Sequence, residues 1–151
     1  MTTIKDLLGE QADILAKSSI AIGDVHLLPL GRGEGITPKN GDSKAKFFVV
    51  LGFDGVGNII GGIVINSKIN HKLPNSITDY LMPISKKSCP FLDYDSFANC
   101  SHLVVVSKAK FNSSTYKGRI EDENTMEQIV GTLSESPYVS KQQLREFGII
   151  K

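Results

Sequence analysis

Three basic side chains in one glycine-rich segment are the residues of this chain best suited to chemistry. Residues 31–45 contain Arg32, Lys39 and Lys44 together with four of the fourteen glycines. Backbone amides and basic side chains can hold a phosphate group without a fixed motif. The GRGEG stretch at its start lacks the terminal Lys-Ser/Thr of a P-loop, and it lacks the full dinucleotide fingerprint. The segment therefore predicts a flexible loop that can contact phosphate groups.

The histidines and cysteines are placed less favourably for a site. His26, His71 and His102 are scattered, and no cluster of Cys, His or carboxylates has ligand spacing, so we predict no metal site and no cofactor. His71 falls in a loop, where a solvated side chain is more common than an acid–base group. Cys100 and His102 would face the same side of a strand, but Cys100 has no basic neighbour in sequence to activate its thiol.

Two further polar patterns have simple structural interpretations. Asp93 and Asp95 bracket Tyr94 ahead of a strand and could form a pair of acids. The Asp95-Ser96 step is more typical of a turn or of the entrance to a strand. The DGVGN sequence at 54–58 lacks the ligand spacing of an EF-hand, and it predicts a β-turn.

The strongest element that could position these side chains is a hairpin at residues 46–67. Two apolar runs rich in β-branched residues, 47–53 and 59–66, flank the turn at 54–58. Each run has the length of a strand, and the glycines between them supply the positive φ of a tight reversal. A lone hairpin is unstable in water, so further strands or a helix must cover it. Because a hairpin joins the residues farthest from its turn, Lys46 and Ser67 should lie side by side.

The rest of the chain predicts an antiparallel sheet or barrel in a single domain. Strands are expected at 23–30 and 77–84, and the segment 96–107 leads into a strand at 103–106. Residues 116–120 could be a strand or a turn, and helices are expected at 3–17, 122–133 and 140–147. Consecutive strands without helical crossovers exclude a doubly wound α/β fold. Within the 151 residues we expect an N-terminal helical extension at 1–19, a barrel with a packing helix at 22–133 and a helical tail at 134–151.

Charge and hydropathy exclude several classes of protein. The net charge is +1, from 17 basic and 16 acidic residues, so any nucleic-acid site must be a local patch. No apolar run reaches transmembrane length, and the N-terminus lacks the features of a secretion signal. The cysteines are expected to be reduced. These features favour a cytoplasmic protein without a membrane partner.

The order of these segments resembles that of the PemK/MazF-like toxins. The resemblance covers about residues 22 to 133 and depends on five stretches: GDVHLLPL at 23–30, AKFFVVL at 45–51, HKLPNSITDYLMPI at 71–84, DSFANCSHLVVVSKAKF at 95–111 and KGRIEDENTMEQIVGTL at 117–133. It implies a mainly β fold, a small SH3-like antiparallel barrel with flanking helices. It also implies a metal-independent endoribonuclease that cleaves single-stranded RNA, forms a homodimer and is neutralised by an antitoxin protein.

The resemblance also implies where a site would lie, and this sequence differs from the family there. Lys46-Phe47-Phe48 stands where the family has a catalytic arginine followed by proline. Lysine keeps the positive charge but lacks the planar fork that grips a phosphate at two points. Ser67 stands where the family has Thr or Ser. Cleavage needs a base for the 2′-OH proton and a cation for the pentavalent phosphate.

These positions give a predicted set of site residues. Lys44 or Lys46 could be the cation, and His71, Glu34 or Asp24 could be the acid or base. The predicted catalytic residues are Lys46, Ser67 and Asp24, and the predicted RNA-binding residues are Arg32, Glu34, Lys39, Lys44 and His71.

Three hypotheses follow. The first is a toxin-like endoribonuclease, and the second is a catalytically inactive barrel of the same fold that serves as a binding or regulatory module. The altered Arg-Pro position and the near-neutral charge favour the second. A more distant third hypothesis is a small-molecule enzyme that uses Cys100 and His102. Convergence of Lys46, Ser67 and the loop at 31–44 on one groove would favour the nuclease.

Overall fold

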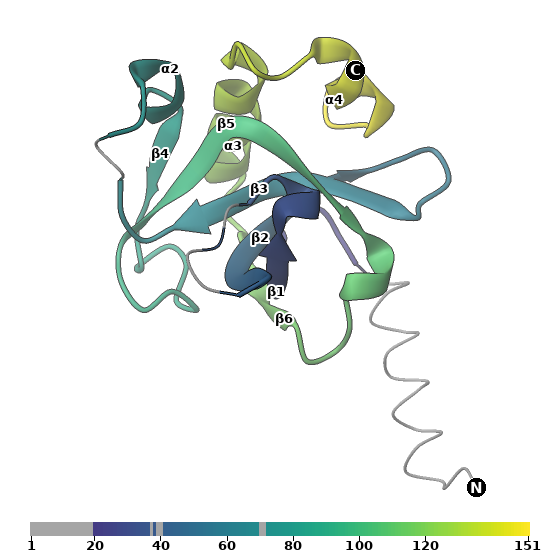
Figure 1. Ribbon diagram of the computed structural model, residues 1–151, viewed down its shortest axis with the longest axis horizontal. Coiled ribbons are helices and arrows are strands. Elements are labelled where there is room, and N and C mark those ends of the chain that lie inside the picture. Colours follow the sequence, from purple (N-terminus) through teal and green to yellow (C-terminus); the bar gives the residue numbers. More distant parts are fainter. Residues whose placement is uncertain (1–19, 37, 39–40, 70–71) are drawn as a thin grey trace, which may run out of the picture.

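A computed structural model describes residues 20–36, 38, 41–69 and 72–151 of the chain. Its centre is a six-stranded antiparallel sheet in the order β4-β5-β3-β2-β1-β6 (Figure 1). The strands are β1 (Asp24–Gly31), β2 (Ser43–Phe53), β3 (Ile59–Asn66), β4 (Leu81–Ile84), β5 (Ser96–Ser107) and β6 (Tyr116–Arg119). The helices are α2 (Asn75–Thr78), α3 (Glu123–Glu135) and α4 (Lys141–Glu146), with 3-10 turns η1 (Arg32–Glu34) and η2 (Lys108–Lys110). The predicted mainly β, antiparallel fold is confirmed.

The predicted central hairpin is confirmed as β2 and β3. Their pairing starts at Phe47 opposite Ile65 and continues to Phe53 opposite Ile60. The Asp54 carboxylate holds the turn by accepting hydrogen bonds from the amides of Gly57 (2.7 Å) and Ile59 (3.2 Å). The segment 31–45 is less loop-like than predicted, because β2 begins at Ser43 and η1 occupies residues 32–34.

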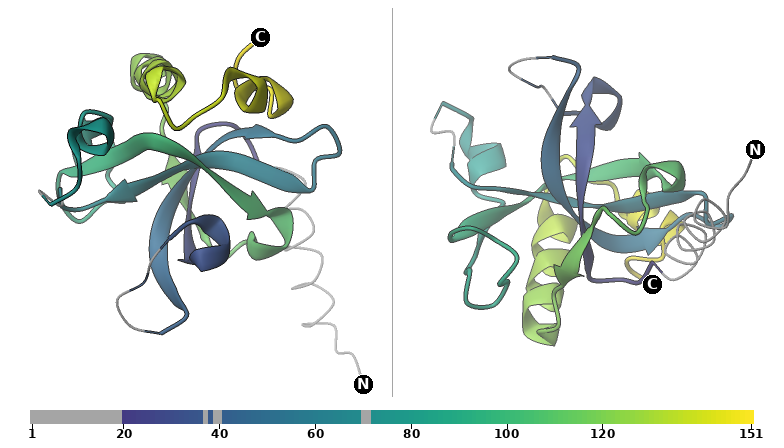
Figure 2. Two further views of the ribbon diagram at one scale, coloured as in Figure 1. Left: turned by 45° about the horizontal axis from the view of Figure 1, so that its top comes forward. Right: turned by 90° about the horizontal axis from the view of Figure 1, so that it is seen from below.

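The sheet carries an apolar core on each of its faces. Helices α3 and α4 cover one core with Ile129, Leu133 and Leu144, which pack on side chains such as Leu51. The other core contains Leu28, Leu30, Phe48, Val50, Ile60, Val64, Val104, Val106 and Phe111. Residues of β1 and β5 can share that core only if the sheet curls, since β2 and β3 lie between them. Figure 2 shows the β1–β2 end turned away from the plane of β3 and β5.

Lys110, just after β5, ties the two sides of this curl together. Its Nζ donates to Glu34 (2.8 Å) and to the backbone carbonyl of Pro29 (3.1 Å). The sheet is nevertheless not closed, because β4 and β6 are its edges and are not paired with each other in the described part of the chain. The expected barrel is therefore an open, curled sheet.

The elements around the sheet follow the predictions in part. Asp122 caps α3 by accepting from the amide of Asn124, and Ser140 caps α4 by accepting from the amide of Gln143. Gly148, at φ +69°, follows the end of α4 in the left-handed conformation. The single strand predicted at 77–84 is wrong: Pro74, with φ fixed near −65°, starts the short helix α2, and only Leu81–Ile84 is strand. The predicted helix at 3–17 lies outside the described residues.

The helices of the described residues are short. The longest is α3, with 13 residues. Among residues 20–36, 38, 41–69 and 72–151, no helix combines the length and the apolar character needed to cross a bilayer.

Candidate functional site

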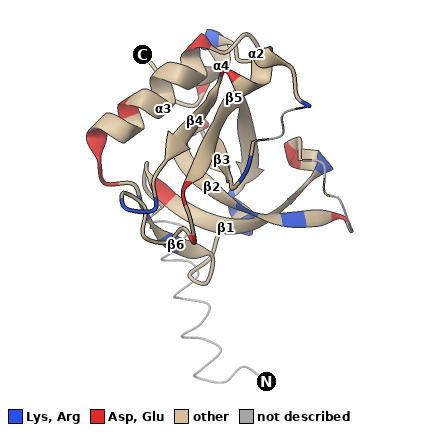
Figure 3. Cartoon of the chain, turned by 90° about the vertical axis from the view of Figure 1, so that its left-hand side faces the viewer, with Lys and Arg blue, Asp and Glu red and all other residues tan. Residues whose placement is uncertain are grey.

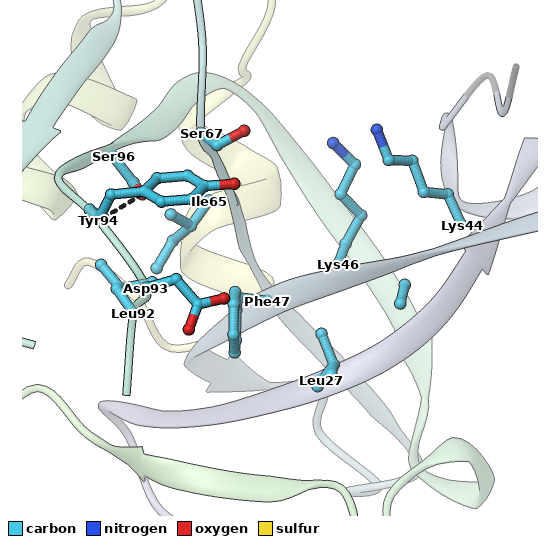
Figure 4. A pocket seen from close by; sticks show the side chains of 11 residues that line it. Leu27, Lys44, Lys46, Phe47, Ile65, Ser67, Leu92, Asp93, Tyr94 and Ser96 are labelled. Carbon is cyan, nitrogen blue, oxygen red and sulfur yellow. Dashed lines mark hydrogen bonds between the residues drawn. The ribbon is translucent and has the colours of Figure 1, made fainter. Parts of the chain in front are cut away.

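A pocket of about 180 Å³ lies beside the N-terminal half of β2 (Figure 4). Leu27, Phe47 and Ile65 form an apolar row across three strands, because Leu27 pairs with Phe47 and Phe47 pairs with Ile65. This row points to the face of the sheet opposite to that of Lys44 and Lys46. The residues that line it are Leu27, Lys44, Ala45, Lys46, Phe47, Ile65, Ser67, Leu92, Asp93, Tyr94 and Ser96. The pocket lining combines apolar with polar residues, as is usual for a small ligand site.

One wall of the pocket is basic. Lys44 and Lys46 are two positions apart on β2, so their side chains leave the strand on the same side, as Figure 4 shows. Lys46 is half-buried, and its Nζ donates to the side-chain oxygen of Asn66 at 2.6 Å. Ser67, the next residue of the chain, also lines the pocket. The sequence-predicted neighbours Lys46 and Ser67 are thus brought together, and Lys44 joins them.

The electrostatics of this wall favour an anion. Burial lowers the pKa of the Lys46 ammonium group, and the neighbouring charge of Lys44 lowers it further. Both effects show that it costs free energy to keep two positive charges close together where they are partly removed from water. A phosphate bound between the two ammonium groups would offset that cost, so the wall is suited to a phosphodiester.

The opposite wall comes from the loop between β4 and β5. Asp93 and Tyr94 are exposed there, and both line the pocket. Asp93 is the one acidic residue among the described residues that line it. Asp95 does not join Asp93 as a pair of acids, because its carboxylate accepts from the backbone amide of Lys86 (2.8 Å) and closes the loop. The sequence showed Tyr94 between two acids but gave no indication that it faces Lys46.

Asp24 is placed elsewhere, in a structural position. It is buried at the start of β1, where one carboxylate oxygen accepts from Arg119 Nε (2.7 Å) and the other from the amide of Ala21 (2.9 Å). Asp24 does not line the pocket, and both of its oxygens are engaged. It ties β1 to β6, so the structure does not bring it together with Lys46 and Ser67.

The other predicted RNA-binding residues are also separate from the pocket. Glu34 accepts from Lys110 and from the amide of Gly31 (3.0 Å), and the hydrogen bond from Lys110 is the main reason that its pKa is lowered. Arg32 is exposed in η1 and does not line the pocket. Lys39 and His71 lie outside the described residues.

The structure separates Cys100 from His102. The register between β3 and β5 shifts between Gly62 and Val64, so residues 100–103 form an irregular stretch. Cys100 is fully buried, and burial raises the pKa of its thiol to about 12. His102 is exposed and stacks on Tyr138, with ring centroids 4.6 Å apart. The expectation that both side chains face the same side is wrong, and a thiol with so high a pKa is not a nucleophile at neutral pH.

Charge is distributed unevenly over the molecule despite the net charge of +1. The charged residues of α3 are all acidic: Glu123, Glu127 and Glu135. Figure 3 shows these positions in red along α3, away from the blue positions along β2.

No family model and no curated protein matches this chain.

Proposed function

We propose that the chain is a metal-independent endoribonuclease that cleaves single-stranded RNA in the pocket beside β2. The observation that carries the proposal is the convergence of Lys44, Lys46 and Ser67 on one pocket. The proposal retains the PemK/MazF-like resemblance: the curled sheet is of the SH3-like type, and the protein is the toxin of a pair, a homodimer neutralised by an antitoxin and resident in the cytoplasm.

The reaction uses the 2′-hydroxyl of the RNA as the nucleophile. The 2′-oxygen forms a bond to phosphorus, the bond from phosphorus to the 5′-oxygen breaks, and a 2′,3′-cyclic phosphate and a 5′-hydroxyl result. The Asp93 carboxylate, in place of the predicted Asp24, takes the proton of the 2′-hydroxyl. Lys44 and Lys46 stabilise the charge on the pentavalent phosphate, and the Ser67 hydroxyl donates to one of its oxygens. The Lys46 ammonium gives a proton to the leaving oxygen, which its lowered pKa favours.

The test is a cleavage assay with a fluorophore–quencher RNA in the presence of EDTA. We expect a cyclic phosphate product and no cleavage of DNA of the same sequence. Lys46→Ala should slow cleavage by about a hundredfold or more, as expected for the loss of one preorganised charge at the transition state. Asp93→Asn should slow it by about 10²- to 10⁴-fold.

Lys141→Ala is the matched control, because Lys141 is an exposed lysine at the start of α4 that does not line the pocket. It should cleave at the unaltered rate. An unaltered chain that leaves RNA intact, or a Lys46→Ala variant that cleaves at full rate, would overturn the proposal.

The second candidate function is an RNA-binding module without catalysis. The observation that favours it is Phe47, which lines the pocket at the position where the resemblance implies a proline. In that case single-stranded RNA binds through Lys44 and Lys46 and stays intact. A plot of the logarithm of the RNA association constant against the logarithm of the salt concentration has a negative slope. Removal of each lysine should make that slope shallower by about 0.7, the value per phosphate contact for single strands.

A further inference from the structure

Tyr94 is a large aromatic side chain that the fold leaves exposed within the pocket. Its exposed fraction is 57%, and it lines the pocket together with Lys44 and Lys46. A single exposed aromatic residue is not unusual on a protein surface. The unusual feature of Tyr94 is how firmly its backbone is held.

Hydrogen bonds fasten the backbone on both sides of the Tyr94 ring. The Ser96 hydroxyl donates to the Tyr94 carbonyl (2.9 Å), and Lys86 Nζ donates to the Asp93 carbonyl (3.2 Å). The residues that flank the exposed stretch are buried: Leu92 is 3% exposed and Ser96 is 5% exposed. The ring is therefore presented to solvent from a fixed support, which reduces the entropy that a ligand must remove on binding.

The loop that carries Tyr94 also packs against neighbouring strands. Phe91, three residues before Tyr94, packs against Phe47 with ring centroids 5.7 Å apart. Gly118 lies against the other side of Phe91, where an added Cβ would be 2.8 Å from the ring. The loop that carries Tyr94 is thus packed through Phe91 against β2 and β6.

The two walls of the pocket suit the phosphate and the base of a nucleotide. In Figure 4 the Tyr94 ring extends towards Ser67, on the side of the pocket where Lys44 and Lys46 project. A phosphate is attracted to the lysine wall and repelled by the Asp93 carboxylate beside Tyr94. Each of the four bases has a flat π-face, so any of them can stack on an aromatic ring. The charge difference between the walls therefore sets the direction in which a nucleotide enters.

We propose that Tyr94 is the platform on which one base of single-stranded RNA stacks while its phosphate lies between Lys44 and Lys46. The proposal rests on the proposed function in taking single-stranded RNA as the ligand. It adds that one nucleotide position is recognised by the presence of a base and not by its identity, because stacking is sequence-tolerant. The Tyr94 hydroxyl group has no part in this recognition.

The test is equilibrium binding of a fluorescent 2′-O-methyl RNA, which has no free 2′-hydroxyl and cannot be cleaved by this reaction. Tyr94→Ala should weaken binding by about ten- to a hundredfold, the range for one base stacked on an aromatic side chain. Tyr94→Phe keeps the ring and should bind within twofold of the unaltered chain. Tyr138→Ala, which removes a tyrosine that is 47% exposed and does not line the pocket, is the matched control and should bind normally.

A second ligand series identifies the stacked base. RNAs in which one base at a time is replaced by an abasic ribose should reveal one position whose loss weakens binding to the unaltered chain by the same factor. That substitution should have little further effect on Tyr94→Ala, because the same contact is already lost. Equal loss in Tyr94→Phe and Tyr94→Ala, normal binding by Tyr94→Ala, or a series without a sensitive position would each overturn the inference.

Failure of the inference is distinct from failure of the proposed function. If the unaltered chain cleaves RNA and Tyr94→Ala binds RNA normally, the stacking role of Tyr94 is wrong and the nuclease function is supported. If the Tyr94 variants and the abasic series bind the uncleavable RNA as expected but natural RNA stays intact, the nuclease function is wrong and the stacking role of Tyr94 is supported. If the unaltered chain binds no RNA, both are overturned.

Discussion

At the scale of single residues, the hydrogen bonds around His26 determine its tautomer. The Thr115 hydroxyl donates its hydrogen to the carbonyl of Asn112 (3.0 Å), so it can only accept from His26 Nδ1 at 2.8 Å. The hydrogen of neutral His26 is therefore on Nδ1, and Nε2 carries a lone pair. Nε2 is buried without a hydrogen-bond partner among the described residues, and Phe111 and Tyr116 pack edge-on against the ring.

This arrangement predicts that acid destabilises the fold through His26. Burial lowers the pKa of His26, and the charge of Asp24 only partly opposes that effect. Below the unfolded pKa of about 6.5, the unfolded chain binds a proton that the folded chain does not. The stabilising contribution is therefore complete above that pH and is lost as the pH falls towards the lower folded pKa. Urea unfolding at pH steps from 7.5 to 5 should show this loss.

Two variants isolate the contribution of His26. His26→Asn keeps a donor for Thr115 but cannot titrate. In this variant the free energy of unfolding should therefore change less with pH between pH 6.5 and 5. His102→Asn, at an exposed histidine, is the control, and its free energy of unfolding should depend on pH as in the unaltered chain. An unchanged pH dependence in His26→Asn would show that another group is responsible.

At the scale of elements, the β2–β3 hairpin depends on one glycine where the strands approach too closely for a side chain. A Cβ added to Gly62 would be 2.0 Å from the Val49 carbonyl oxygen and 2.7 Å from the Phe48 ring. Gly62 also lies where the pairing of β3 with β5 shifts register. The path of β3 towards Asn66 and Ser67, and with it the pocket wall, depends on this close approach.

We expect Gly62→Ala to destabilise the fold by about 3 kcal/mol or more, because backbone must move to admit the methyl group. Gly55→Ala, in the turn of the same hairpin, is the matched control, since an added Cβ there meets nothing within 4 Å. Its free energy of unfolding should change by less than about 0.5 kcal/mol. Urea unfolding followed by circular dichroism measures both values, and equal stabilities would refute the argument.

At the scale of the whole molecule, the C-terminal tail belongs to the core of the sheet. Leu144 is fully buried and Phe147 is 8% exposed, and the amide of Phe53 donates to the Phe147 carbonyl (2.9 Å). Gly52 and Gly61 make room for this crossing: an added Cβ would be 2.1 Å from the Phe147 carbonyl oxygen at Gly52 and 2.9 Å from the Phe147 ring at Gly61. The part of the chain beyond the resemblance thus closes the core that α3 begins to cover.

Phe147→Ala should lower the free energy of unfolding by about 3–5 kcal/mol, the usual cost of truncating a buried phenylalanine. Arg145→Ala is the control, because Arg145 is exposed on the same helix, and its effect should stay within about 0.5 kcal/mol. Thermal and urea unfolding measure both. A small effect of Phe147→Ala would mean that the tail is dispensable for the core.

Local features of this fold could be predicted from the sequence because the interactions that create them span few residues. The hairpin turn at Asp54, the caps at Asp122 and Ser140 and the stop at Gly148 each involve partners within five positions. The neighbourhood of Lys46 and Ser67 belongs to this class, because hairpin pairing follows from the turn. The strand predicted at 77–84 failed at its start because the Pro74 carbonyl accepts from the amides of Ile77 (2.9 Å) and Thr78 (3.1 Å) and so holds a helical turn there.

The hairpin and the neighbouring positions of Lys46 and Ser67 thus follow from the order of residues along the chain, whereas long-range contacts set what lies opposite the two lysines. Asp24 and Glu34 are engaged by Arg119 and Lys110, 95 and 76 residues away, which no local pattern indicates. Tyr94 faces the lysines because the β4–β5 loop is anchored through Phe91 and Ser96. Local hydrogen bonds set each element, whereas long-range packing and ion pairs set which elements meet.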